Sequence, residues 1–151
     1  MHLFLDSNAL VKLYHAETGT ENLVCLLKEN AYDLILTIAE ISKIEFRSAF
    51  LKRVRTKEIE FEIVKEAFSC FEDDLFMFNV VGVDEAVNSL AINLLDSIAY
   101  EKGLRTLDSI QLSTAIITNQ ILRIDYFVTS DKTLANVAKD YFPIFDPESA
   151  M

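Results

Sequence analysis

Short apolar runs alternate with longer amphipathic stretches along this chain. The runs are four or five residues long and rich in Leu, Ile, Val and Phe, which is typical of buried strands; they cover 2–5, 33–37, 79–83 and 126–129. Between them, apolar residues recur every three or four positions, which indicates helices. The helices are expected at 8–15, 20–30, 40–55, 58–78, 84–100, 106–120 and 131–140, and a last edge strand at 143–145.

Strands that alternate with helices predict βαβ units and therefore a parallel sheet. Gly occurs three times and Pro twice, so few residues interrupt the helices. We expect an α/β fold, a three-layer α/β/α sandwich with a short parallel sheet of about four to five strands and about seven helices. The 151 residues correspond to a single domain, 1–151, which is long enough to bury a sizeable core.

The composition is that of a globular protein. Hydrophobic residues make up 51% of the chain, and no apolar stretch reaches the ~18 residues of a membrane span. The start lacks the basic and long apolar segments of a signal peptide. We therefore expect a cytoplasmic protein without a membrane partner. Cys25 and Cys70 form no CxxC pattern and are expected to be buried thiols rather than a disulfide or a zinc pair.

The charge is acidic overall but unevenly distributed. The net charge of −10 argues against non-specific nucleic-acid binding, yet six of the 14 Lys and Arg residues lie between Lys43 and Lys57. A solvated helix surface is one interpretation of this basic stretch. The other is a surface that guides a phosphate backbone, with Arg47, Lys52 and Arg53 as candidate contacts.

Two aspartates follow directly on predicted strands. Asp6 ends the first strand and Asp131 follows the strand at 126–129. Ligands of parallel α/β sheets bind at the carboxyl ends of the strands, so the two carboxylates converge if these strands are neighbours. Helix capping is the simpler explanation for Asp131, whereas Ser7 or Asn8 could cap the first helix and leave Asp6 without a structural role.

Two further acids lie on apolar helices. The helical neighbours of Glu45 include no cation, which excludes a salt bridge within its helix but leaves one to a distant residue open. Asp108 lies among apolar residues, and it could pair with Arg105 or interact with the helix dipole. Burying such carboxylates without a partner is costly.

Four carboxylates in one cleft require cations. Clustered acids repel each other strongly, and an all-oxygen ligand set selects Mg²⁺ or Mn²⁺ over zinc. Other chemistries lack their motifs: no GxxxxGK loop is present, Asn8 stands where an aspartyl phosphatase would need a second Asp, and His2 and His15 have no acidic partner pattern.

The chain resembles the PIN-domain ribonucleases, most closely the VapC-type toxins of toxin–antitoxin pairs. LDSNALVKLY, IEFRSAF, LRTLDSIQLSTAI and FVTSD occur in the order of that family and span the chain from Leu3 to about Lys139. The stretch GLRTLDSIQLSTA is the most specific of them.

The resemblance implies a set of site residues. Asp6, Glu45, Asp108 and Asp131 match the acidic quartet that binds Mg²⁺ or Mn²⁺ in PIN domains. Four polar residues match the positions beside the first and last acids: Ser7, Asn8, Thr129 and Ser130. Ala39, Ser109 and Ser113 depart from the family pattern, and none of these departures removes a ligand.

The resemblance also implies an activity and partners. It predicts metal-dependent endonucleolytic hydrolysis of RNA, a cognate antitoxin protein and a homodimer. An alternative of a different class remains, namely a PIN-like binding module with little catalytic activity that acts through protein or RNA partners.

Overall fold

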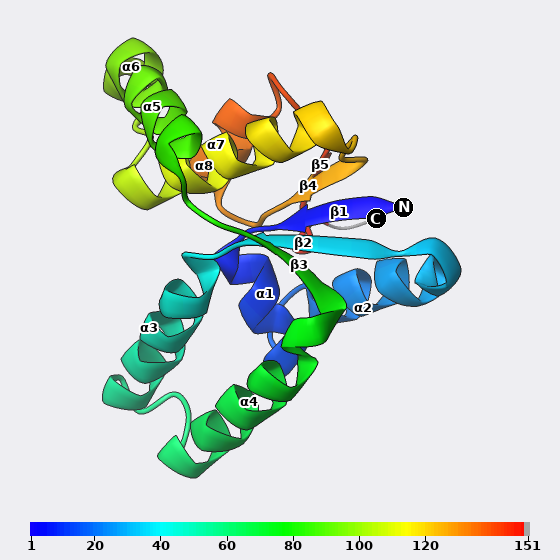
Figure 1. Cartoon of the computed structure of the whole chain (residues 1–151). Helices are drawn as coiled ribbons and strands as arrows, with labels where there is room; N and C mark the ends of the chain where they lie inside the picture. The colour runs from blue at the N-terminus through cyan, green and yellow to red at the C-terminus, as the bar shows by residue number, and fades with distance from the viewer. Residues whose placement is uncertain (150–151) are drawn as a thin grey trace.

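A five-stranded, fully parallel sheet forms the centre of the computed structural model, which describes residues 1–149 (Figure 1). The strand order is β3-β2-β1-β4-β5, so the first strand pairs with both the second and the fourth. The strands are β1 (His2–Leu5), β2 (Ile35–Ala39), β3 (Phe78–Val81), β4 (Tyr126–Val128) and β5 (Ile144–Phe145). The condition under which Asp6 and Asp131 converge, that the first and fourth strands are neighbours, is therefore met.

Helices cover both faces of the sheet, α1–α4 on one side and α5–α8 on the other (Figure 1). They are α1 (Ser7–Tyr14), α2 (Thr20–Glu29), α3 (Ser42–Arg55), α4 (Phe61–Asp74), α5 (Glu85–Leu94), α6 (Tyr100–Lys102), α7 (Thr106–Ile121) and α8 (Lys132–Ala138). A π-helical turn, Leu95–Ala99, joins α5 to α6 in one continuous helix, which leaves seven helices in the described part of the chain. The predicted three-layer α/β/α sandwich is confirmed.

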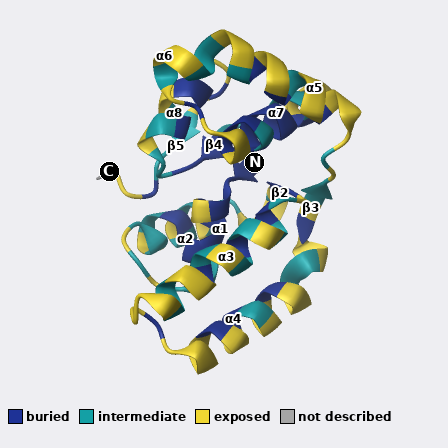
Figure 2. Ribbon diagram, turned by 90° about the vertical axis from the view of Figure 1, so that its left-hand side faces the viewer, coloured by how far each residue is buried: buried dark blue, intermediate teal, exposed yellow. Residues whose placement is uncertain are grey.

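The alternation of side chains along β1 builds two cores. Leu3 and Leu5 pack into the cluster under α1–α4, whereas Phe4 points to the opposite cluster under α5, α7 and α8. All three side chains are fully buried, because β1 lies in the middle of the sheet. In Figure 2, exposed residues gather on the outer sides of the helices and buried residues near the sheet. Because β1 packs into both cores, the position of its carboxyl end, and hence of Asp6, is held from both faces of the sheet.

The helix expected at 58–78 is shorter than predicted. It ends at Asp74, a 3₁₀ turn follows (Leu75–Met77), and Phe78 already belongs to β3. Phe71 and Phe78 are buried in the core, whereas Phe61 and Phe76 are 47% and 85% exposed. Phe61 begins α4 and Phe76 lies in the turn that follows it, so the apolar side chains at both ends of this segment face solvent.

The prediction of buried thiols is wrong. Cys25 and Cys70 are both free and exposed, on the outer faces of α2 and α4. The Cys25 thiol donates a hydrogen bond to Glu29 one turn later (3.4 Å), and this bond raises the pKa of the thiol. The inner face of α2 is occupied by Leu23 instead.

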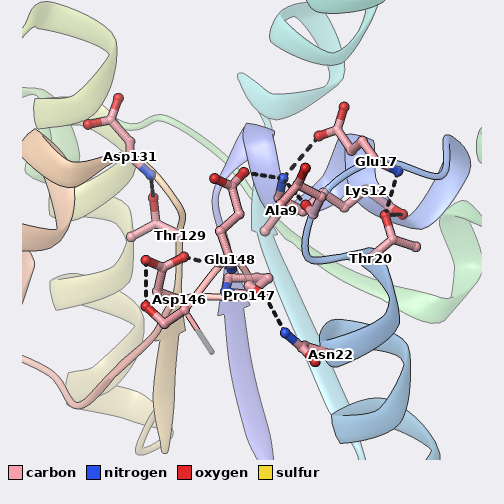
Figure 3. Close-up of polar contacts among 12 residues, drawn as sticks. Ala9, Lys12, Glu17, Thr20, Asn22, Thr129, Asp131, Asp146, Pro147 and Glu148 are labelled. Atoms are coloured by element: carbon pink, nitrogen blue, oxygen red, sulfur yellow. Dashed lines mark hydrogen bonds and ion pairs between the residues drawn. The ribbon is translucent and has the colours of Figure 1, made fainter. Parts of the chain in front are cut away.

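The segment after β5 is held against the junction of α1 and α2 (Figure 3). The buried Lys12 ammonium donates to Glu148 (2.7 Å) and Glu17 (3.1 Å), and Asn22 donates to the Pro147 carbonyl (2.9 Å). Gly19 lies so close that a Cβ there would come within 2.7 Å of the Pro147 carbonyl group. These contacts join the segment after β5 to the end of α1 and the start of α2.

Among residues 1–149, no helix is long and apolar enough to cross a membrane.

Candidate functional site

A cleft of about 490 Å³ opens at the carboxyl ends of β1 and β4. It lies where the strand order places Asp6 beside the β4–α8 loop, as expected for a parallel sheet. All four predicted acids line it, although they come from segments far apart in the sequence. The lining residues are Asp6, Ser7, Asn8, Glu45, Arg105, Thr106, Leu107, Asp108, Gln111, Asp131 and Leu134.

Asp6 is buried at the bottom of the cleft. Its Oδ1 accepts a hydrogen bond from the Ala9 amide (2.7 Å) and caps α1, and its Oδ2 accepts one from the Thr129 hydroxyl (2.5 Å). Burial raises the pKa of Asp6 to about 7, and the charges of Asp131 and Glu45 add to the rise, while the two hydrogen bonds oppose it. The sequence pattern suggested Ser7 or Asn8 as the helix cap; the structure shows that Asp6 does the capping and still lines the cleft.

Thr129 connects Asp6 to Asp131. Its hydroxyl donates to Asp6 and accepts from the Asp131 amide (3.0 Å), as Figure 3 shows for the second contact. Asp131 Oδ1 caps α8 by accepting from the Leu134 amide (2.9 Å). The capping interpretation of Asp131 is therefore correct, and it leaves Oδ2 for the cleft.

Glu45 belongs to a hydrogen-bonded network of polar side chains from α1, α3 and α7. Its Oε1 accepts hydrogen bonds from the Ser7 hydroxyl and from Gln111 Nε2, both at 2.9 Å. The same Gln111 nitrogen also lies within hydrogen-bond distance of the Ser7 hydroxyl (2.9 Å) and the buried Ser42 hydroxyl (2.8 Å), so its two hydrogens are shared among three acceptors. Glu45 Oε2 makes no hydrogen bond within residues 1–149 and remains available to a ligand.

Asp108 lies in the first turn of α7 and is paired with Arg105. Arg105 Nε donates to Asp108 Oδ2 (3.0 Å), and Arg105 Nη2 donates to Asp131 Oδ2 (2.7 Å). The hydrogen bond to Asp108 and the charges of both aspartates raise the pKa of the guanidinium. The Arg105–Asp108 pair was an expected alternative; the bridge to Asp131, 26 residues away, depends on the tertiary structure.

The candidate RNA contacts lie outside this cleft. Arg47 is paired with Glu72 of α4, and Arg53 is paired with Glu17 (2.9 Å). Lys52 is exposed on α3. Asn8 lines the cleft, whereas Ser130 does not, and Thr129 lies buried behind Asp6.

Sequence reasoning did not identify Gln111 and Ser42 as part of the site. Both are buried, and both contact the network that holds Glu45. The available signal was an amide in the middle of a helix predicted to be buried, because such a group needs hydrogen-bond partners. Its partners come from α1 and α3, so the sequence alone could not name them.

The donors in this cleft suit a hard divalent cation in type. Asp108 Oδ1 and Glu45 Oε2 make no hydrogen bond to the described chain, and the buried Gln111 Oε1 accepts none either. Nevertheless, no group of three or more His, Cys, Asp or Glu residues within 1–149 is arranged closely enough to hold a metal ion. The cation that joins two of the acids in this structure is the Arg105 guanidinium.

Comparisons with known proteins place the fold. No protein-family model and no curated protein sequence matches this chain. Solved structures match it over nearly its whole length. FitAcB from Neisseria gonorrhoeae gives a TM-score of 0.68 at 19% identity, with 98% of this chain and 99% of that chain covered.

Two further structures agree with this result. VapBC2 from Rickettsia felis, bound to a DNA fragment from its promoter, gives a TM-score of 0.64 at 16% identity, with 97% and 98% of the two chains covered. A toxin–antitoxin complex from Klebsiella pneumoniae gives 0.63 at 17% identity, with 98% and 99% covered. At these identities the likeness shows a shared fold, and it confirms at that level the resemblance to VapC-type PIN-domain proteins inferred from the motifs.

Proposed function

We propose that this protein is a metal-dependent endoribonuclease and the toxin of a type II toxin–antitoxin pair. The observation that carries the proposal is the convergence of Asp6, Glu45, Asp108 and Asp131, from four separate segments, on one cleft. The full-length likeness to chains of toxin–antitoxin complexes supports the second half of the proposal.

Mg²⁺ or Mn²⁺ is the cofactor that these donors suit best. Asp6, Asp108 and Asp131 would hold it, and Glu45 would complete the site directly or through a water molecule. A divalent cation at a phosphodiester lowers the pKa of water and stabilises the charge that develops on the phosphoryl oxygens.

The residues of this chain position the reacting groups. The Ala9 amide and the Thr129 hydroxyl fix both oxygens of Asp6, and Ser7 and Gln111 fix one oxygen of Glu45. Because the hydrogen bonds to Oε1 hold the carboxylate in place, the position of Oε2 is fixed as well. We expect Oε2 to orient the attacking water and accept its proton. Attack of that water on phosphorus would break the bond to the 3′ oxygen, which takes up a proton from solvent water, and so leave a 5′-phosphate and a 3′-hydroxyl.

The basic end of α3 is the proposed path of the RNA backbone. Lys52 is exposed, and it lies in the last turn of α3 together with Arg53 and Arg55. Arg47 and Arg53 form ion pairs with Glu72 and Glu17, which offset part of their positive charge. Their contribution to phosphate binding is therefore smaller than the sequence suggests. We also propose a cognate antitoxin partner and a homodimer, as the family resemblance implies.

The experiment that tests the activity is cleavage of a labelled single-stranded RNA with Mg²⁺, Mn²⁺ or EDTA. The Asp108→Asn variant is expected to lose at least about a hundredfold in rate, because several kcal/mol of charge stabilisation depends on this ligand. It should remain folded, since the amide oxygen can still accept from Arg105. Asp140→Asn, which removes a carboxylate that pairs with Lys102 and does not line the cleft, is the matched control.

Cleavage that persists in Asp108→Asn at the wild-type rate would contradict the assignment of the site. A folded wild-type protein, free of antitoxin, that cuts no RNA with either metal would instead favour the binding-module alternative.

A further inference from the structure

Arg105 joins two acids of the cleft that belong to different elements. It stands at the N-cap of α7 with extended backbone (φ −92°, ψ 167°), and its guanidinium reaches Asp108 on the same helix and Asp131 at the start of α8. The planar guanidinium fork suits this bridge, because two different nitrogens donate to two different carboxylates.

Arg105 occupies the carboxylate oxygen that a ligand would need. Asp131 Oδ1 is committed to the Leu134 amide, so Oδ2 is the oxygen that remains for the cleft, and Arg105 Nη2 holds it at 2.7 Å. One oxygen of Asp108 is held in the same way. A cation bound by Asp131 through Oδ2 would therefore compete with the guanidinium for this oxygen.

The Arg105 side chain can leave without disturbing the core. It is 68% exposed, whereas the side chains of Asp108 and Asp131 are 12% and 17% exposed. Its described side-chain hydrogen bonds go only to these two aspartates. Among the described residues that line the cleft, it is also the single Lys or Arg facing four acids.

We propose that Arg105 is a built-in counter-cation that holds the Asp108–Asp131 pair in the metal-free protein and competes with the divalent cation for it. The inference rests on the proposed function for the identity of the ligand, but not on RNA cleavage. It explains why four carboxylates share one cleft without a compact metal-binding group within residues 1–149: the guanidinium lies between two of them.

Mn²⁺ binding, measured from the electron paramagnetic resonance signal of the free ion at fixed ionic strength, tests the proposal. Arg105→Ala is expected to bind Mn²⁺ about three- to tenfold more tightly than the wild type, the range for losing two partly exposed ion pairs. Arg105→Lys keeps the charge but cannot bridge both aspartates. Its Mn²⁺ affinity is expected to lie between those of the wild type and Arg105→Ala. Without metal, Arg105→Ala should melt at a lower temperature than the wild type. Mn²⁺ should raise the melting temperature of Arg105→Ala by more than it raises that of the wild type.

Lys132→Ala is the matched control. Lys132 is an exposed cation next to Asp131 in sequence, and its contact is with Asp146 (3.8 Å) rather than with the four acids. Its removal changes the net charge by the same amount, and its Mn²⁺ affinity should stay within about twofold of the wild type.

Two results would overturn the proposal. One is an Arg105→Ala protein, folded by circular dichroism, that binds Mn²⁺ no more tightly than the wild type. The other is an equal gain in Arg105→Ala and Lys132→Ala, which would indicate general electrostatics rather than competition for one oxygen. Tighter Mn²⁺ binding by Arg105→Ala together with no RNA cleavage by the wild type would refute the proposed function and leave this inference standing.

Discussion

The buried Asp6 carboxylate makes a specific prediction about stability and pH. Asp6 is 3% exposed, and burial with the charges of Asp131 and Glu45 raises its pKa from 3.8 to about 7. Between these two pKa values the folded protein binds a proton that the unfolded chain has released. The free energy of unfolding of the metal-free protein therefore falls as the pH rises from about 4 to about 7.

The magnitude follows from the two pKa values. The raised pKa lowers the free energy of unfolding by roughly 2 kcal/mol at pH 5.5 and roughly 4 kcal/mol at pH 8, at 1.36 kcal/mol for each unit of pKa difference. Asp6→Asn keeps the shape and an acceptor for the Ala9 amide, but it carries no charge. The difference in unfolding free energy between this variant and the wild type should therefore grow in favour of the variant by about 2 kcal/mol between these pH values.

Urea unfolding in EDTA at pH 5.5 and pH 8, for both proteins, measures this change. Titrating groups outside the cleft affect both proteins alike, so the comparison reports on Asp6 and the acids coupled to it. An Asp6→Asn variant whose advantage stays constant, or turns into a loss at pH 8, would refute the reasoning. Mg²⁺ added at pH 8 should narrow the gap, because a bound cation stabilises the ionised carboxylate of the wild type alone.

Two further predictions concern the supports of the cleft. Gln111→Leu is expected to fold and to lose about 10- to 100-fold in Mn²⁺ affinity or RNA cleavage, because Glu45 loses one of the two donors that orient it. If this variant keeps both the wild-type Mn²⁺ affinity and the wild-type cleavage rate, Gln111 does not position Glu45. Gly19→Ala is expected to lower the free energy of unfolding by at least about 1–2 kcal/mol, since φ is +87° and the new Cβ would meet Pro147. Its urea midpoint measures this loss, and an unchanged midpoint would contradict the close packing of the segment after β5.

The sequence determined the class of the fold through local patterns. The alternation at Leu3-Phe4-Leu5 and the helical spacing from Thr106 onward predict a buried strand and a buried helix, because both patterns depend on which side of an element meets water. The order of the motifs along the chain is also enough to single out the four acids of the cleft. The wrong prediction concerns residues whose local pattern is compatible with two positions. Cys25 and Cys70 could lie on either face of their helices, and both face solvent.

Only the tertiary structure decided how these residues act together. The order of the strands places β4 beside β1, which lets Thr129, 123 residues after Asp6, connect Asp6 to Asp131. The packing of α7 against the ends of α1 and α3 lets Gln111 hold Glu45. The turn into α7 aims Arg105 at an acid on another element. Such contacts depend on the directions of side chains from distant segments, and no spacing along the chain encodes those directions.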